Sequence, residues 1–450
     1  MSELDASDDA SGPSLVERLF QVRRDEMPVV GWSWLYIFAI LSSYYVMRPI
    51  REQMGVSGGI ENLPWLFTAT LVAMILLNVP FGYLVKLLPR IRFIPITYRF
   101  FTANIILFAV ALYLANRDQA VWIGRFFFVW LSVFNLFVIS IFWQTIVDVF
   151  TSEQGKRLFG FIAAGATIGA IAGSAATALL ARSVPTWALL VGAALLLEVA
   201  VFSMRRLSRL SDRLYHKPAT QSGERAVGGS AYAGIVHLLR SPYLLNVSLF
   251  FILFSITSTF LYFEQVGIAA KAFPDRGAQT TFFASVDLAV NILTLAIQLF
   301  LTGRVVRLFG VGLALASLPL LTIFGFGVLV YAPTIVAIVA FQVLRRAGNF
   351  GIARPTREVL FTVLPREDRY KSKSFIDTVM YRLGDQVGAW SYTLVGALGW
   401  GAGALPLVAL PISAVWLFNA IWLGRRQEEL AVRAPARGRS TEAPEVAAAS

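Results

Sequence analysis

Four arginines lie within a single apolar segment, residues 333–364: Arg345, Arg346, Arg354 and Arg357. A guanidinium group keeps its proton and binds phosphate or carboxylate oxygens through paired N–H donors. Charged groups are costly inside apolar segments, so each is a functional candidate. Asn349 and Glu358 belong to the same segment. The pattern predicts a cationic, anion-binding cavity; the alternative is a set of mutually neutralised charges that only hold helices together.

Acidic side chains in neighbouring apolar segments are candidates for coupling or gating. Asp287 shares a helix face with Asn291, four residues later. A row at four-residue intervals ends at Asp385: Asp377, Tyr381, Asp385. Arg382 is one turn from Asp385 and can neutralise it. A buried carboxyl favours its neutral form, so Asp287 is a candidate for proton coupling; alternatively, it pairs with an arginine and takes no part in transport.

The first and seventh apolar segments end in charged residues. Arg48, Arg51 and Glu52 close the first, and Glu264 closes the seventh, in a place comparable to that of Arg48. These residues predict an outer rim that binds anions and closes through an Arg–Glu bridge. The alternative is that they only extend to the lipid headgroups. Asp148 lies at the end of the fourth segment and is a candidate gate residue.

Several other chemistries are excluded. The chain has no cysteine and only two histidines, which rules out disulfides, thiol catalysis and Cys- or His-rich metal sites. Gly165, Gly169 and Gly173 have the spacing of a phosphate loop but lack its Gly-Lys-Ser/Thr ending. Small residues at this spacing instead let helices pack closely. We therefore expect no enzyme activity, no cofactor and no metal.

The composition is that of an integral membrane protein. Of 450 residues, 57% are hydrophobic and 15% are charged, against 45–50% and about 25% in soluble domains. About 20 apolar residues span a bilayer, and in lipid a single segment pairs its own backbone N–H and C=O groups only as a helix. We therefore expect twelve transmembrane helices. Their ranges are 32–50, 62–84, 93–115, 121–150, 157–181, 185–205, 241–265, 278–303, 309–331, 333–364, 371–397 and 402–424.

The basic residues predict the orientation. With the N-terminus in the cytoplasm, most of the 39 Lys and Arg residues fall on the inner side, as the positive-inside rule requires. We expect both termini to be cytoplasmic, in a bacterial inner (plasma) membrane. The predicted parts are an N-terminal segment (1–31), two six-helix bundles (32–205 and 241–424), a basic linker (206–240) and a disordered tail (425–450). The linker either binds anionic headgroups or only fixes the topology.

A weak internal repeat supports two equivalent halves. Gly82-Tyr-Leu-Val-Lys86 and Gly303-Arg-Val-Val-Arg307 follow the second and eighth segments. Three further positions recur 215 residues later: Lys156, Gly169 and Gly173 as Lys371, Gly384 and Gly388. This organisation, an all-α membrane protein of twelve helices in two six-helix halves, resembles the major facilitator superfamily. Lys86 and Arg307 then occupy the place of that superfamily's cytoplasmic gating motif.

Two stretches resemble the nucleotide transporter (ATP/ADP antiporter) family of plastids and intracellular bacteria. One contains Phe142-Trp143, Asp148 and Thr151-Ser-Glu-Gln-Gly-Lys156-Arg157. The other contains Arg354-Pro-Thr-Arg357-Glu358, Lys371-Ser-Lys373-Ser-Phe-Ile-Asp377 and Arg382-Leu-Gly384. The resemblance implies nucleotide exchange, and it assigns charged transport positions to Arg51, Asp148 and Glu264. The chain departs from the family pattern at Arg354, where the family has an acid, and at Asp385, where it has a lysine.

These features favour a secondary transporter that moves a small organic anion by alternating access. The substrate is a nucleotide, another phosphorylated metabolite or a carboxylate, and the partners are this solute and the lipid bilayer, without nucleic acid. We expect a functional monomer. The expected anion ligands are Arg48, Arg51, Arg345, Arg346, Asn349 and Arg382. The expected gating or coupling residues are Lys86, Asp148, Glu264, Asp287, Arg307, Arg354, Arg357, Glu358 and Asp385. Alternatives are a proton-coupled transporter of another solute, a membrane scaffold or sensor, and a lipid-handling protein.

Overall fold

The computed structural model describes residues 23, 26–87, 90–150, 152–214, 241–364, 373, 376–400 and 404–433. Within these ranges the regular structure is helical throughout and no residue forms a strand. Most of the predicted N-terminal segment, the linker from residue 215 and the tail from residue 434 lie outside the described residues. So do the side chains of Lys86, Lys156 and Asp377.

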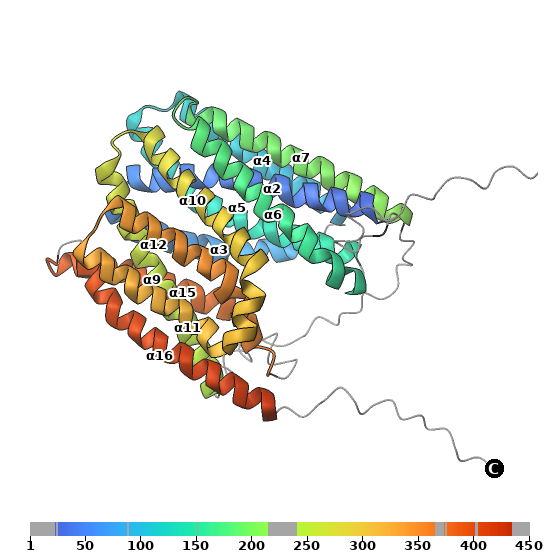
Figure 1. Cartoon of the computed structure of the whole chain (residues 1–450). Helices are drawn as coiled ribbons and strands as arrows, with labels where there is room; N and C mark the ends of the chain where they lie inside the picture. The colour runs from blue at the N-terminus through green and yellow to red at the C-terminus, as the bar shows by residue number, and fades with distance from the viewer. Residues whose placement is uncertain are drawn as a thin grey trace, which may run out of the picture. The chain divides into compact units, whose positions relative to one another are not determined.

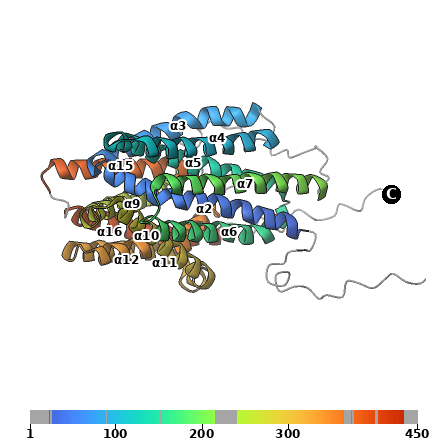
Figure 2. The ribbon, with the colours of Figure 1, turned by 90° about the horizontal axis from the view of Figure 1, so that it is seen from above.

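The chain divides into two compact units. The first comprises residues 1–59, 69–221 and 273–291. Its complete helices are α2 (Met27–Ser57), α4 (Arg90–Leu114), α5 (Arg117–Val149), α6 (Ser152–Leu180) and α7 (Thr186–Leu214). It also holds most of α3 (Leu63–Leu87) and the first part of α10 (Arg276–Phe300). Helix α2 is central, because it packs against α5, α6 and α7 (Figures 1 and 2).

The second unit comprises residues 60–68, 222–272 and 292–450. Its longer helices are α9 (Pro242–Ala272), α11 (Thr302–Tyr331), α12 (Ile335–Gly348), α15 (Tyr381–Ala397) and α16 (Ala404–Arg433). Its shorter elements are η1 (Ile60–Asn62), the π-helical η2 (Asn349–Ala353), α13 (Arg354–Leu360) and the π-helical η3 (Ile376–Met380). Helix α9 is central here, since α12, α15 and α16 all pack against it.

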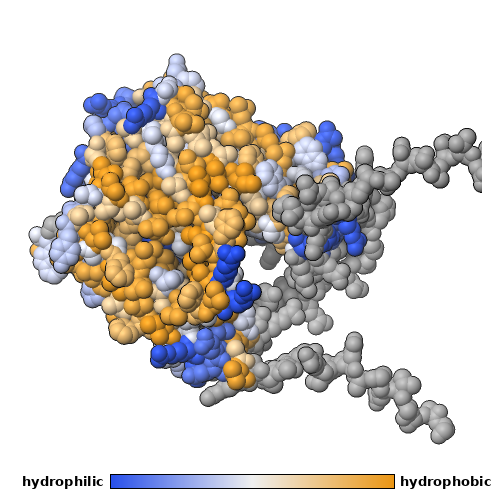
Figure 3. Space-filling model, viewed as in Figure 1, coloured by the Kyte–Doolittle hydropathy of each residue, from blue (hydrophilic) through white to orange (hydrophobic). Residues whose placement is uncertain are grey.

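The helices match the predicted spans. Among the described residues, eleven helical runs are long and apolar enough to cross a membrane, and each overlaps a predicted span, although some, such as Met27–Ser57 against 32–50, are longer. The predicted span 371–397 is described from residue 376, as η3 followed by the 17-residue α15. Apolar side chains cover most of the face drawn in Figure 3. Large apolar residues such as Leu179 and Phe418 are 79% and 73% exposed, as lipid-facing residues are.

The repeated glycines make the same kind of helix contact in both units. In α6, a Cβ at Gly169 or Gly173 would collide with the carbonyl oxygens of Phe38 and Ser42 in α2. In α15, a Cβ at Gly384 would lie 2.8 Å from the carbonyl oxygen of Ile252 in α9. Close backbone approach therefore requires glycine at these positions, and the packing interpretation of the glycine spacing is confirmed.

Candidate functional site

The charged end of α2 forms a compact cluster within the first unit. Arg48 Nη1 lies 3.1 Å from Asp287 Oδ1 of α10, and Arg51 Nη1 lies 3.0 Å from Glu52 Oε1. Arg48 Nε is also 4.0 Å from Glu52 Oε1. Arg51 donates from Nε to the carbonyl of Phe128 at 3.2 Å, and its guanidinium lies 3.7 Å from the centre of that ring. We call Arg48, Arg51, Glu52 and Asp287 the α2 cluster.

The α2 cluster balances two cations with two anions. The carboxylates are the more deeply buried members, at 4% exposure for Asp287 and 7% for Glu52, against 21% and 17% for Arg48 and Arg51. Ion pairing offsets part of the cost of removing these charges from water. Sequence left two roles open for Asp287, and the structure pairs it with an arginine. Asn291, the next polar residue on that face, donates to Ser174 of α6 at 3.5 Å.

A second site in the second unit holds Arg345 of α12. Its side chain is only 3% exposed. It donates from Nε to Thr322 at 3.1 Å and from Nη1 to Ser258 at 2.8 Å. Nη2 donates to Thr257 at 2.9 Å and to the Phe254 carbonyl at 3.2 Å. These hydroxyl and carbonyl acceptors, together with Arg345, form what we call the Arg345 socket.

The Arg345 socket has no acid in it. In the described part of the chain, no carboxylate oxygen comes within 4.0 Å of the guanidinium, which instead lies over the rings of Phe254 and Trp416 at 5.1 and 5.9 Å. Neutral hydroxyl dipoles therefore replace water around this cation without cancelling its charge. Thr257 and Ser258 are adjacent in α9, but sequence reasoning did not connect these two hydroxyls with Arg345.

The neighbouring charged residues of the second unit are paired locally. Asp385 accepts from Ser255 at 2.5 Å and lies 3.4 Å from Arg382. Arg357 is buried over the rings of Phe251 and Phe254, and it donates to Asn349 at 3.4 Å. The two π-helical turns, η2 and η3, immediately precede Arg354 and Tyr381; such turns are frequent at functional sites.

The remaining predicted site residues are more exposed. Glu358 makes an ion pair with Lys373 at 3.2 Å. Arg354, Arg307 and Asp148 are exposed, whereas Glu264 and Arg346 are half-buried. The structure thus gathers Arg48, Arg51 and Asp287 in the first unit and encloses Arg345 in the second. Among the other predicted residues of the second unit, Arg382 pairs with Asp385 and Arg357 with Asn349.

Sequence reasoning missed a buried acid at the start of α2. Glu26 Oε1 accepts from Arg157 at 2.7 Å and from Gln154 at 3.0 Å, and Oε2 accepts from the Arg23 backbone N–H at 3.1 Å. Burial opposes ionisation of Glu26, but these hydrogen bonds outweigh it and hold its pKa below the ordinary value. Gln154 and Arg157 belong to the motif that carried the family resemblance, so part of that motif anchors α2.

No metal centre is visible in the described ranges, where no three Asp, Glu, His or Cys side chains are grouped to hold an ion. The polar sites are instead arginine-centred. Guanidinium groups held by aromatic rings and hydroxyls suit anions with several oxygens.

Solved structures of membrane transporters share this fold. A POT family transporter in complex with 5-aminolevulinic acid matches with a TM-score of 0.59 and 11% identity, over 89% of this chain and 96% of that one. A bacterial homologue of the iron transporter ferroportin, in an inward-facing state, matches with a TM-score of 0.58 and 12% identity, over 88% and 98%. The chain therefore shares the all-helical fold of these proteins.

The family follows from sequence. The model of the TLC ATP/ADP transporter family matches residues 119–427, more than half of the chain, and the chain belongs to this family. ADP,ATP carrier protein 1 of Chlamydia pneumoniae is 22% identical over 477 residues, covering 90% of this chain and 93% of the relative. The protein of the same name from Chlamydia trachomatis serovar D is 20% identical over 478 residues, covering 90% of each. The resemblance inferred from the motifs is confirmed.

Proposed function

We propose that this protein exchanges adenine nucleotides across a bacterial inner membrane by alternating access. The observation that carries the proposal is the match to the TLC ATP/ADP transporter family over residues 119–427. The relatives named as ADP,ATP carriers align over 90% of the chain, so the proposal rests on both halves.

The α2 cluster supplies the chemistry for phosphate recognition. Arg48 and Arg51 each have a carboxylate partner, which offsets part of the desolvation cost of the two cations before substrate binds. The oxygens of a polyphosphate compete with Glu52 and Asp287 for the same N–H donors. Binding then exchanges one set of anionic partners for another, and release restores the internal pairs. We propose Arg48 and Arg51 as phosphate ligands and Asp287 and Glu52 as the residues that replace the substrate.

The Arg345 socket contributes in a different way. Its donors already have acceptors, so it does not need to contact the substrate to act. A buried guanidinium without a nearby acid leaves a positive potential that favours an anionic solute. We propose that Arg345 serves as this fixed charge, that Arg346 and Arg382 add further positive charge, and that Asn349 contributes a neutral hydrogen-bonding amide. The gating roles assigned to Lys86, Asp148, Glu264, Arg307, Arg354, Arg357, Glu358 and Asp385 remain predictions.

Proton-coupled transport is the second candidate, and the Arg48–Asp287 distance of 3.1 Å counts against it. Asp287 is 4% exposed and in contact with Arg48, so a proton carried at this position would leave Arg48 without this counter-charge. In the proposed exchange, by contrast, the substrate phosphates take the place of the carboxylates beside Arg48 and Arg51.

The test is counterflow in proteoliposomes that are preloaded with ADP and supplied with labelled ATP outside. We expect uptake that requires the internal nucleotide and is lost in Arg51→Ala. Arg426→Ala is the matched control, because Arg426 is an exposed arginine whose partner is Glu429 of its own helix. Equal uptake by empty vesicles would exclude exchange. If the folded, reconstituted protein gave no nucleotide flux, ATP and ADP would be excluded as its substrates.

We further propose that both termini and the 206–240 linker are cytoplasmic and that the monomer transports. The chain lacks cysteine, so a single introduced cysteine reports its own location. Ser222→Cys in the linker should react with an impermeant maleimide only after right-side-out cells are opened. Labelling in intact cells would reverse the proposed orientation.

A further inference from the structure

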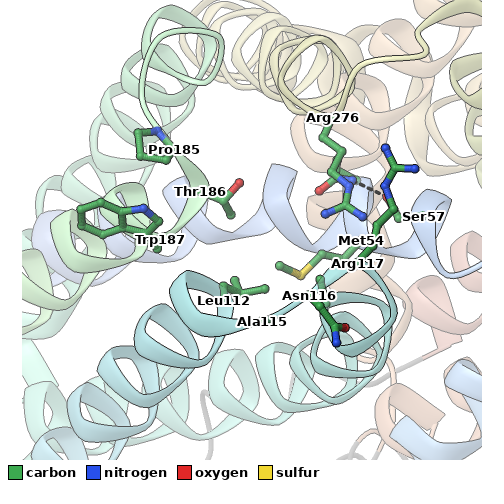
Figure 4. Close-up of a pocket in the computed structure, with 12 residues that line it drawn as sticks. Met54, Ser57, Leu112, Ala115, Asn116, Arg117, Pro185, Thr186, Trp187 and Arg276 are labelled. Carbon is green, nitrogen blue, oxygen red and sulfur yellow. Dashed lines mark hydrogen bonds between the residues drawn. The ribbon is translucent and has the colours of Figure 1, made fainter.

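A cavity of about 380 Å³ opens at the end of the first unit where α2 and α4 finish and α5 and α7 begin (Figure 4). The start of α10 completes it. All of its lining residues belong to the first unit. Its volume is within the range of small-molecule sites, about 300–1,000 Å³. The proposed transport function does not use this cavity.

The only charged residues that line the cavity are two arginines, Arg117 and Arg276. Neither guanidinium has a carboxylate within 4.0 Å among the residues that the structure describes. The nearby Asp275 accepts from the backbone N–H of Ala278 at 2.8 Å, so it caps its own helix and does not line the cavity. Two unneutralised cations at one cavity attract an anion.

The opposite wall is aromatic and apolar. Trp187 is 37% exposed, and its ring meets Tyr113 edge-on at 5.5 Å, which fixes its orientation. Figure 4 places Trp187 and Pro185 on one side of the cavity and Arg117 and Arg276 on the other, with Thr186 between them. A phosphate at the arginines would leave the rest of its molecule against the tryptophan, so the cavity suits a phosphate ester better than a bare anion.

The cavity is separate from the α2 cluster but adjoins it along α2. The buried side chains of Gln53 and Met54 line it, directly after Arg51 and Glu52. Gln53 donates to Ser57 at 2.5 Å, and Ser57 also lines the cavity. The last turns of α2 therefore form one wall of the cavity. A solute held here is therefore one helical turn from the cluster. In the proposed orientation this end of the unit faces outward.

We propose that this cavity is a second site, which binds a phosphate ester through Arg117 and Arg276. The ligand is either a nucleotide, held before it enters the transport pathway, or the headgroup of an anionic phospholipid. The nucleotide form rests on the proposed function. The recognition chemistry is the same for both sources, and the following experiment separates them.

The experiment uses single cysteines in the naturally cysteine-free chain, reconstituted in phosphatidylcholine nanodiscs. Thr186→Cys reports from the cavity, and Ser183→Cys is the matched control, since Ser183 is exposed nearby and does not line the cavity. The maleimide reaction rate is measured alone, with ATP, and with phosphatidylglycerol added to the discs. Ligand at ten times its dissociation constant should slow Thr186→Cys about tenfold and leave Ser183→Cys unchanged.

Two further variants decide the interpretation. Arg117→Gln with Arg276→Gln should abolish protection of Thr186→Cys, whereas Arg51→Ala should preserve it. Protection by ATP identifies a nucleotide site, and protection by phosphatidylglycerol alone identifies a lipid headgroup site. The proposal is overturned by protection from neither, by protection that survives loss of both arginines, or by protection that disappears in Arg51→Ala. Because Arg51→Ala is the variant that removes counterflow, failure of this site and failure of the transport proposal give different results.

Discussion

The ion pair between Arg48 and Asp287 allows a quantitative test of the α2 cluster. The atoms are 3.1 Å apart and Asp287 is 4% exposed, so removing one partner takes a close counter-charge away from a largely buried group. Such removal costs about 3–5 kcal/mol. The cost of Arg48→Met should lie at the upper end of this range, because it removes the arginine from Asp287, the more buried member of the pair. Asp287→Asn should lie at the lower end, because Glu52, 4.0 Å away, still faces Arg48.

The double variant Arg48→Met with Asp287→Leu separates stability from transport. Replacing a buried pair by apolar residues of similar size is often nearly neutral, so the double variant should unfold close to the parent. Since each single variant costs about 3–5 kcal/mol, the cycle should therefore give a coupling energy of about 6 kcal/mol or more in magnitude. Nucleotide counterflow should stay abolished, since both the phosphate ligand and its replacement are gone.

The assays are chemical denaturation in detergent micelles and counterflow in proteoliposomes. The matched control is Arg426 with Glu429, a pair at 2.6 Å that lies beyond the predicted span 402–424 and whose side chains are 39% and 53% exposed. We expect almost no coupling there. Equal coupling for the two pairs would refute the argument from burial. Recovery of counterflow in the Arg48–Asp287 double variant would refute the transport role.

Three other predictions follow from single contacts. The hydrogen bonds to Glu26 lower its pKa below the ordinary value of about 4.5, so the Arg157–Glu26 contact stabilises the fold above that pH. This stabilisation is lost as the pH falls through the lowered pKa. In Glu26→Gln, the denaturation midpoint should therefore fall less steeply with decreasing pH. Gly169→Leu should prevent folding or lower the free energy of unfolding by about 3 kcal/mol or more, because the new side chain would collide with the α2 backbone. Gly160→Leu is the control: nothing lies within 4 Å of a Cβ at Gly160, so this variant should unfold like the parent. Arg345→Lys should lower the free energy of unfolding by about 2–3 kcal/mol, since one ammonium group cannot reach the four acceptors that the guanidinium contacts. An unchanged thermal unfolding curve would contradict this expectation.

The sequence by itself determined the helices, their order and the family. A run of about 20 apolar residues is a local property, and lipid leaves it few structures other than a helix. The glycines repeated at a 215-residue interval also predicted close helix packing, and Gly169 and Gly384 both require it. The two motif-bearing stretches, 142–157 and 354–384, identified the family because residue types and order carry it, without knowledge of any contact.

Only the tertiary structure decided which charges meet. Arg48 and Asp287 are far apart in sequence, and a rotation of either helix by a fraction of a turn would separate them. Nothing local indicated that Arg345 has hydroxyl partners instead of an acid, or that Glu26 meets Arg157. Helix rotation is fixed by the packing of all neighbouring side chains at once, as at the Gly169 contact. The partners of a buried charge are therefore non-local, although its presence in the membrane can be read from the chain.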